Sequence, residues 1–310
     1  MRALLLLLAL PCWGQDAERL VVLADPHLPG RNLELKRKAL EDINAWEDVE
    51  GVAVLGDLCN DVGSPEEYTA AKEFFSRLKK PLYPIPGNHD IVYRRLPDGK
   101  KEKAGPAERA ALLERFQETF NLPDARYSRK LGPYLALFVP NDDLESPYLA
   151  AISSGTLAWM EAELSREKDA PAMVFFHAPL KGTLRSRNAA AEKDSFVAQP
   201  AETLRALLKK HPQVFLWASG HTHVAPSNAR FKHAVNLYDG RVWNIHNPDM
   251  DGRSYLDSKH KETTDHDGLW SNSLFLYPDK VVVKTFDHRR GAWLDKLTRE
   301  LRPSGKVQAR

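Results

Sequence analysis

Polar side chains follow apolar runs at five places in the 310-residue sequence, where strands are predicted to end. They are Asp25 and His27 after "RLVVLA", Asp57 after "GVAVLG", Asn88 and His89 after "PLYPIPG", His177 after "AMVFF", and His221 and His223 after "VFLWASG". The carboxyl ends of parallel strands meet at one edge of an open α/β sheet, so these side chains should converge. Such nitrogen and oxygen donors suit more than one transition-metal ion, and the sequence therefore predicts a metal site at this edge.

Each motif has a simpler explanation when it stands alone. An Asp-x-His tripeptide is commonly part of a loop, a histidine such as His177 on an apolar strand is commonly a core residue, and Gly-Asp after a strand is commonly a turn. Burying the whole set in one crevice without a ligand would cost several kcal/mol. Bound metal ions would offset that cost, which favours ligation for the set.

The elements that must position these side chains alternate between strand and helix. Apolar residues at helical spacing, such as Leu33, Leu40 and Ile43, predict helices, and Ser64 followed by Pro65 is typical of a helix start. Strands are expected at 19–27, 51–57, in the run that stops at Pro86, and at 134–140, 172–179 and 214–223, with helices at 33–46, 64–80, 107–120, 155–168 and 201–210. The alternation predicts an α/β fold with parallel strands and helices outside.

The remainder of the chain is expected to complete a single domain over residues 15–310, because no repeat or long linker divides it. The segments "RVWNIHNP", "NSLFLYP" and "KVVVKTFDH" are expected to be successive antiparallel strands, followed by a basic tail. Polar stretches at 96–106, 181–199 and 251–270 are expected to be surface loops. Lys and Arg number 44 against 42 Asp and Glu, and no basic block indicates nucleic-acid binding.

The first fourteen residues, "MRALLLLLALPCWG", have the pattern of a secretory signal peptide, with one arginine, an apolar run and small residues. A lipid anchor on Cys12 is a weaker alternative, because Pro11 stands where a small residue is usual. Removal of residues 1–14 would leave an exported protein, periplasmic or secreted, with no other apolar run of membrane-spanning length. Its single cysteine, Cys59, could form no internal disulfide and is interpreted as a packing residue.

The ordered motifs resemble those of a known family. Asp-x-His, Gly-Asp, Gly-Asn-His-Asp, a lone histidine and Gly-His-x-His, in this order over roughly residues 19–225, are the signature of the calcineurin-like metallophosphoesterases. "GDLCNDVGSPEEY" followed by "PLYPIPGNHD" is most similar to the bacterial class III cyclic-nucleotide and glycerophosphodiester phosphodiesterases. The resemblance implies the metallo-dependent phosphatase fold, a four-layer α/β/β/α sandwich of two mixed sheets packed face to face.

The resemblance also implies a role for each motif residue. Two divalent ions, Mn, Fe or Zn, would be held by Asp25, His27 and His223 at the first position and by Asn88, His177 and His221 at the second, with Asp57 bridging them. A shared hydroxide would attack phosphorus. His89 would be the general acid or a hydrogen-bond donor to the leaving group.

The implied function is hydrolysis of a small phosphodiester by an exported enzyme. A broad-specificity phosphomonoesterase is the first alternative, and a non-catalytic, metal-bound interaction scaffold is the second. The stretch from Gly56 to Gly63 lacks the phosphate-binding arginine of the related protein Ser/Thr phosphatases, and Asn60 stands where their aspartate orients the catalytic histidine. That departure argues against a phosphoprotein phosphatase. The oligomeric state is left open.

Four residues near the motifs are hypotheses for substrate contact. Their side chains suit an anionic substrate, although surface exposure is the commoner role of such residues: Tyr93, Arg94, Arg95 and Lys181. The glycines beside the motifs, at positions 56, 87 and 220, fit tight turns where the backbone comes close to the site. The cluster "SKHKETTDHDG" at 258–268 is interpreted as a solvated loop, with a lid or metal patch as the alternative.

Overall fold

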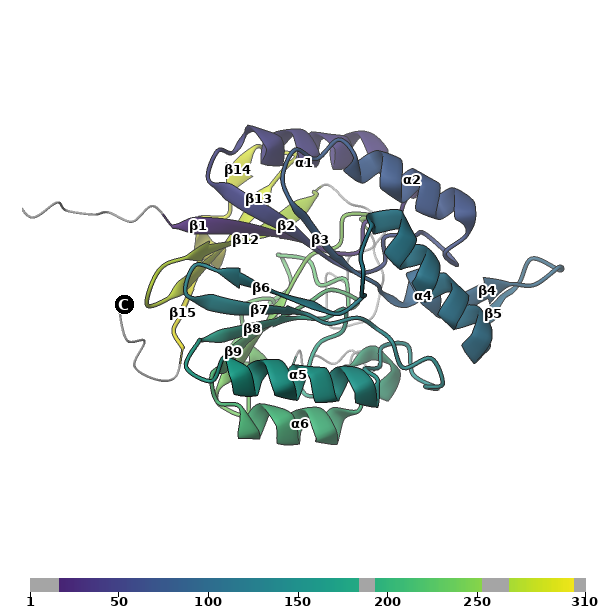
Figure 1. The fold of residues 1–310 in the computed structure, drawn as a ribbon. Helices are drawn as coiled ribbons and strands as arrows, with labels where there is room; N and C mark the ends of the chain where they lie inside the picture. The colour runs from purple at the N-terminus through teal and green to yellow at the C-terminus, as the bar shows by residue number, and fades with distance from the viewer. Residues whose placement is uncertain (1–16, 184–192, 253–267, 304–310) are drawn as a thin grey trace, which may run out of the picture.

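Two β-sheets packed face to face form the centre of the protein, and helices cover the outer face of each sheet (Figure 1). The computed structural model describes residues 17–183, 193–252 and 268–303. The expected α/β class with two mixed sheets is confirmed. The predicted signal peptide and most of the 258–268 cluster lie outside the described residues.

The first sheet has the strand order β14-β13-β12-β1-β2-β3, with β15 also paired to β13. Its strands are β1 (Glu18–Leu23), β2 (Val49–Leu55), β3 (Leu82–Ile85), β12 (Trp270–Leu276), β13 (Val281–Asp287), β14 (Ala292–Trp293) and β15 (Arg299–Leu301). The first three run parallel to one another, whereas β12 is antiparallel to β1. Helices α1 (Leu33–Ala45) and α2 (Pro65–Phe75) cover its outer face.

The second sheet has the strand order β10-β11-β9-β8-β7-β6. Its strands are β6 (Tyr127–Leu131), β7 (Tyr134–Phe138), β8 (Ala172–Phe175), β9 (Val214–Ser219), β10 (Leu237–Tyr238) and β11 (Val242–His246). Helices α5 (Ser154–Arg166) and α6 (Ala201–Lys210) cover its outer face (Figure 1). The segment of the chain from β3 to β6 contains α3 (Asn88–Ile91), the strand pair β4 (Tyr93–Arg95) and β5 (Lys101–Lys103), and α4 (Pro106–Phe120).

Local sequence accounts for the elements that flank the site. The strands β1, β2, β8 and β9 are buried on both faces, which explains why they appear as continuous apolar runs. Helix α2 begins as expected: the Ser64 side chain accepts the Glu67 N–H, and the Glu67 carboxylate accepts the Ser64 N–H in return. Pro65 occupies the first turn, where no N–H is needed.

One expectation for the C-terminal part is wrong. The strand β11, in "RVWNIHNP", runs parallel to β9 in the second sheet, with Trp243 opposite Leu216, rather than antiparallel beside β12. Its direction depends on which strand it pairs with in the folded protein, and local sequence does not specify that partner. Most of the stretch 251–270, expected to be a surface loop, lies outside the described residues, and its first residue, Asp251, is buried. Of the stretch 96–106, Lys101–Lys103 form the strand β5.

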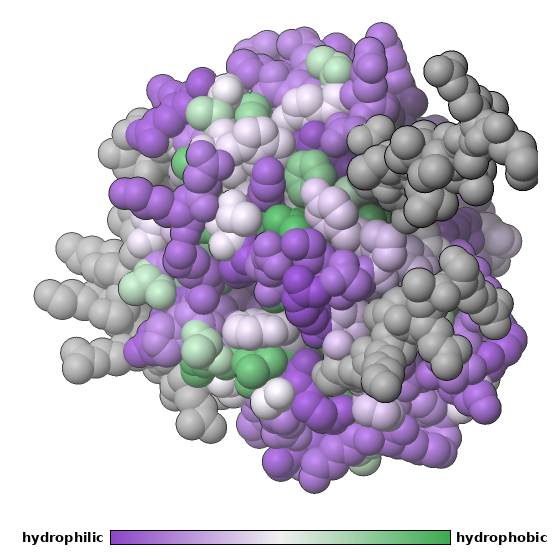
Figure 2. Space-filling view, turned by 90° about the vertical axis from the view of Figure 1, so that its left-hand side faces the viewer, coloured by the Kyte–Doolittle hydropathy of each residue, from purple (hydrophilic) through white to green (hydrophobic). Residues whose placement is uncertain are grey.

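The core lies in three layers that match this architecture. One cluster fills the space between the sheets and contains Phe138, Phe175 and Phe215, and two others lie between each sheet and its helices. Figure 2 shows the side of the molecule at which β1 begins, where polar residues cover most of the surface and apolar ones lie in small groups. Within the described ranges, no helix has both the length and the apolar character needed to cross a membrane.

Packing between the sheets gives a first prediction. The Phe138 ring is fully buried and stacks on Tyr127 and Phe175, with ring centroids 4.8 and 4.9 Å away. Phe138→Ala should reduce the free energy of unfolding by about 3–5 kcal/mol, because it leaves a cavity between the sheets. Phe120→Ala, at the partly exposed end of α4, is the control. Denaturant titration measures both; equal losses would contradict the assigned packing.

Candidate metal centre

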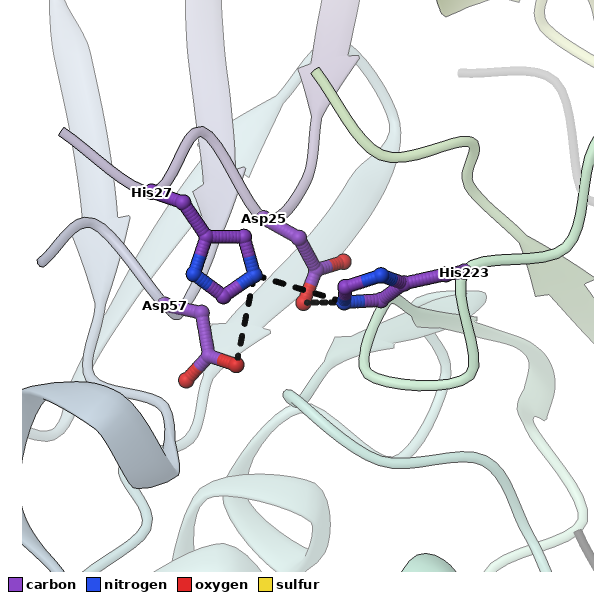
Figure 3. A group of neighbouring side chains, drawn as sticks. All are labelled: Asp25, His27, Asp57 and His223. Carbon is purple, nitrogen blue, oxygen red and sulfur yellow. Dashed lines mark hydrogen bonds and ion pairs between the residues drawn. The ribbon is translucent and has the colours of Figure 1, made fainter. Parts of the chain in front are cut away.

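The carboxyl ends of parallel strands from both sheets bring the polar motifs together. Asp25, His27, Asp57 and His223 offer ligand atoms that all lie within 4.8 Å of one another. We call these four residues the first donor group (Figure 3). Asp57, His177 and His221 form another such set within 4.8 Å, and we call them, with Asn88, the second donor group. Asp57 therefore belongs to both groups.

The first donor group contains two imidazoles and two carboxylates that face one another (Figure 3). His27 Nε2 lies 3.9 Å from Asp57 Oδ2, and His223 Nε2 lies 3.5 Å from Asp25 Oδ1. The two Nε2 atoms are 3.4 Å apart. The side chains of Asp25, His27 and Asp57 are at most 2% exposed, and that of His223 is 11% exposed. Such a nitrogen and oxygen set suits a divalent transition metal.

The second donor group is ordered by a backbone carbonyl. His177 Nδ1 donates to the Leu55 carbonyl at 2.7 Å, which leaves Nε2 as the ring's acceptor nitrogen. That Nε2 lies 2.9 Å from Asn88 Oδ1 and 3.4 Å from Asp57 Oδ1. Three acceptor atoms this close repel one another unless a cation lies among them. His221 Nε2 is buried without a hydrogen-bond partner in the described part of the chain, as expected of a ligand atom.

The backbone at the donor residues is strained. Five of the eight non-glycine residues with positive φ in the described ranges belong to the donor groups: Asp25, His27, Asp57, His221 and His223, with φ between 45 and 63°. A left-handed conformation costs about 1–2 kcal/mol for an ordinary residue. Such strain persists where the surroundings enforce it, and it concentrates at functional sites.

Three glycines let the strand-end loops approach the donor atoms. A Cβ at Gly87 would lie 2.3 Å from Asp57 Oδ1, one at Gly220 would lie 2.4 Å from Asp25 Oδ2, and one at Gly56 would lie 2.6 Å from His177 Nδ1. No side chain fits at these distances. The close approach anticipated at these positions is therefore present.

Asp90, which follows the Asn88-His89 pair, links two loops rather than offering a ligand atom. Its carboxylate accepts the Cys59 N–H at 2.8 Å and the Gly87 N–H at 2.7 Å. Burial and the nearby Asp57 raise the pKa of Asp90 to about 7. Cys59 itself is fully buried in the cluster under α1 and α2, in agreement with a packing role.

His89 differs from its neighbours by being partly exposed. Its N–H donates to Asp57 Oδ1 at 2.8 Å, which fixes the backbone beside the shared carboxylate. The imidazole contacts the His27 ring edge-on, with ring centroids 4.9 Å apart, and the Tyr93 ring at 5.3 Å. The ring thus stands at the accessible margin of the donor groups, where a group that exchanges a proton with substrate must stand.

The pKa values of His221 and His223 are shifted in opposite directions. Burial, together with His177 and His223, lowers the pKa of His221 well below its ordinary value, so His221 is neutral and ready to ligate. Burial also disfavours charge on His223, but Asp25 and then Asp249 outweigh it and raise the pKa of His223 to about 10. For Asp57, burial raises the pKa, and the attraction of His177 opposes that rise.

Most of the candidate substrate contacts lie in surface ion pairs. Arg94 Nε lies 2.8 Å from Glu102 Oε1, Arg95 pairs with Asp61, and Lys181 Nζ lies 3.0 Å from Asp194 Oδ1. Tyr93 alone of the four stands beside the donor groups, with its ring against His89. Burial raises the pKa of Tyr93 to about 12, so its hydroxyl remains a hydrogen-bond donor.

Two neighbours of the donor groups were missed from the sequence. Asp249 Oδ2 lies 3.6 Å from His223 Nδ1, and the Phe196 ring stacks on His221 at 5.2 Å. Asp249 follows β11 as the other polar residues follow their strands, so the strand-end rule would have found it if β11 had been predicted to be parallel. Phe196 carries no comparable signal, because a lone aromatic residue in a polar stretch has many uses.

The sequence is similar to one protein family and to named proteins. The model of the calcineurin-like phosphoesterase family matches residues 18–225. The glycerophosphodiester phosphodiesterase GpdQ from Enterobacter lignolyticus is 31% identical over 193 residues, 57% of this chain and 57% of the relative. A 3',5'-cyclic-nucleotide phosphodiesterase from Nostoc sp. is 26% identical over 186 residues, 60% of this chain and 59% of the relative. The match thus spans less than two thirds of either relative.

Solved structures share the fold at lower identity. A dimetal phosphatase from Danio rerio superposes with a TM-score of 0.64 at 14% identity, covering 93% of this chain and 100% of the other. GAP50, described as the anchor in the inner membrane complex of Plasmodium, gives 0.59 at 14% identity, with 94% and 90% covered. Since the family model extends from the first strand through the Gly-His-Thr-His motif, over more than half of the chain, this protein belongs to the calcineurin-like phosphoesterase family.

Proposed function

We propose that this protein is a metal-dependent phosphoric ester hydrolase whose substrate is a small phosphodiester. The observation that carries the proposal is the Asp57 carboxylate, which is shared by two donor groups. A shared carboxylate between two sets of nitrogen and oxygen atoms is the arrangement that a two-metal phosphoesterase requires. The family match and the orphaned His221 nitrogen support it independently.

The donor groups fit a pair of divalent ions, of which Mn, Fe and Zn all accept such ligands. The first ion would be held by Asp25, His27 and His223, the second by Asn88, His177 and His221, and Asp57 would touch both. A divalent pair supplies positive charge that stabilises the transferring phosphoryl group and makes water acidic enough to react near neutral pH.

The residues of the chain itself then orient the substrate and move protons. Hydrolysis forms a bond from water oxygen to phosphorus and breaks the bond from phosphorus to the leaving alcohol. His89, partly exposed and packed edge-on against His27, can give a proton to the leaving oxygen. Its position is held by the hydrogen bond from its own N–H to Asp57. The Tyr93 hydroxyl is a second donor at this margin.

The charge around the site favours a diester over a monoester. A phosphodiester carries one negative charge, whereas a monoester carries close to two near neutral pH and benefits from an additional cationic partner. Arg94, Arg95 and Lys181 are engaged in surface pairs. The names of the two curated relatives describe phosphodiesterases, which supports the same choice. A broad-specificity phosphomonoesterase is the alternative.

A non-catalytic scaffold is a second candidate, because GAP50 shares the fold and is described as an anchor. The complete donor set and the position of His89 favour catalysis.

We also propose export, supported by the arginine and apolar run of residues 1–14, which lie outside the described residues. N-terminal sequencing of the mature protein would test the expected cleavage after Gly14.

Substrate choice can be tested directly with two chromogenic esters. With Mn²⁺ or Zn²⁺ supplied, the protein should hydrolyse bis-(p-nitrophenyl) phosphate with a higher kcat/KM than p-nitrophenyl phosphate, because Arg94, Arg95 and Lys181 are held in surface pairs and do not offer the additional cationic partner that a dianionic monoester favours. Efficient turnover of the monoester with the diester untouched would instead identify a phosphomonoesterase. No turnover of either, in a protein that binds metal, would favour the scaffold.

The shared carboxylate provides the next prediction. Asp57→Asn should lower kcat by about 10³-fold, since loss of several kcal/mol of metal-assisted stabilisation is expected. The bound metal per chain, measured by elemental analysis, should fall as well. Asp61→Asn is the matched control, because Asp61 lies four positions away and pairs on the surface with Arg95. Full activity of Asp57→Asn would rule out a bridging role.

Proton linkage offers a further check. The pKa of His223 is about 10 in the metal-free protein, so its ring carries a proton at pH 8 that must leave before Nε2 can ligate. Metal binding should therefore release a proton at pH 8 and strengthen as the pH rises toward 10. Calorimetric titration with Mn²⁺ in buffers of different ionisation enthalpy counts the protons. Release unchanged in His223→Asn would contradict this assignment.

A further inference from the structure

A buried ion pair lies behind the first donor group. Lys36 Nζ, on α1, is 2.6 Å from Asp251 Oδ1, and both side chains are 0% exposed. Removing two charges from water is expensive, and a buried ion pair is weak evidence of a gain in stability. Neither residue belongs to the strand-end motifs that supply the two donor groups. We therefore look for a role of the pair beyond stabilising the folded protein.

The same atoms hold the loop that carries His27. Asp251 Oδ1 also accepts the Arg31 N–H at 2.6 Å, and Lys36 Nζ lies 3.4 Å from the His27 carbonyl oxygen. Gly30 lies close to both the His27 carbonyl oxygen and the Asp251 carboxylate. A Cβ at this position would lie 1.9 Å from the His27 oxygen and 2.5 Å from Asp251 Oδ1. The ion pair thus binds both ends of the 27–31 turn.

The two residues before Asp251 contact the rest of the first donor group. Met250 N–H donates to the Ala24 carbonyl at 3.0 Å, beside Asp25. Ala24 and Asp249 form an isolated parallel bridge, and Asp249 Oδ2 lies 3.6 Å from His223 Nδ1. A carboxylate beside the non-ligating nitrogen of a histidine sets the orientation of the ring.

We propose that Asp249, Met250 and Asp251, together with Lys36, form a buried brace that positions His27 and His223 for the first metal ion. The brace acts on the first donor group alone. The second group has separate supports, namely the Leu55 carbonyl on His177 and the Asp90 carboxylate on the Gly87 N–H. The proposal rests on the metal-binding part of the proposed function and is independent of the substrate.

Backbone strain explains why a brace is needed. His27 and His223 adopt left-handed backbone conformations, with φ of 45° and 46°. An unsupported loop would relax from such conformations and move the imidazoles. A charge-assisted bond to the His27 carbonyl and a carboxylate beside His223 oppose that relaxation.

The test separates positioning from stability with a double variant, Lys36→Met/Asp251→Asn. It removes both charges, so no uncompensated ion is left in the interior, and the introduced amide oxygen can still accept the Arg31 N–H. In a His177→Ala background, which disables the second group, Mn²⁺ binding measured by equilibrium dialysis reports the first group. The double variant should weaken it by about 10–100-fold, the range expected for residues behind a ligand. In a His27→Ala background it should leave the remaining affinity unchanged.

Two further variants keep the proposal open to refutation. Arg19→Met removes another buried cation, at the start of β1, and should lower stability without changing Mn²⁺ affinity. Asp249→Asn, nearly isosteric, should weaken the first group by a similar factor even if the double variant fails to fold. Wild-type affinity in Asp249→Asn or in a folded double variant would overturn the brace. Failure of the wild type itself to bind two ions would instead overturn the proposed function.

Discussion

The buried Asp57 carboxylate is the constraint on which the site depends. Its two oxygens face different partners: Oδ1 accepts the His89 N–H and lies 3.4 Å from His177, whereas Oδ2 lies 3.9 Å from His27. Burial raises the pKa of this group and so opposes its ionisation, whereas nearby positive charge and the hydrogen bond from the His89 N–H favour the ionised form. An acid placed in this way among imidazoles is costly on its own and becomes favourable when cations share it. The remaining donors are arranged around that requirement.

The two-sheet architecture makes this arrangement possible. Asp25 and Asp57 follow parallel strands of one sheet, and His177 and His221 follow parallel strands of the other. The carboxyl ends of these four strands lie on the same side of the molecule. The strands beneath are buried on both faces, so the loops are anchored in a tightly packed interior. That interior can enforce left-handed conformations that a free loop would abandon.

Each donor group has its own polar support behind it. Asp90 ties the loop of Gly87 to the backbone of Cys59, next to the second group, and the Lys36–Asp251 pair holds the turn after His27, next to the first. Buried polar groups of this kind are expensive unless fully bonded, and here their bonds end on the backbone of ligand loops. The two halves of the site therefore depend on different parts of the chain, and they can be disturbed separately.

Local sequence determined the elements whose causes are local. Ser64-Pro65 set the start of α2, the apolar runs set β1, β2, β8 and β9, and the parallel-strand rule was enough to bring Asp25 and Asp57 together at the ends of two paired strands of one sheet. Tertiary structure alone decided the direction of β11, the approach of Asp249 to His223 and the burial of Lys36, which in a helix would ordinarily face water. The partner of Lys36 lies 215 positions away. Strand pairing and charge burial depend on what the fold brings alongside a residue, and a one-dimensional pattern does not contain that information.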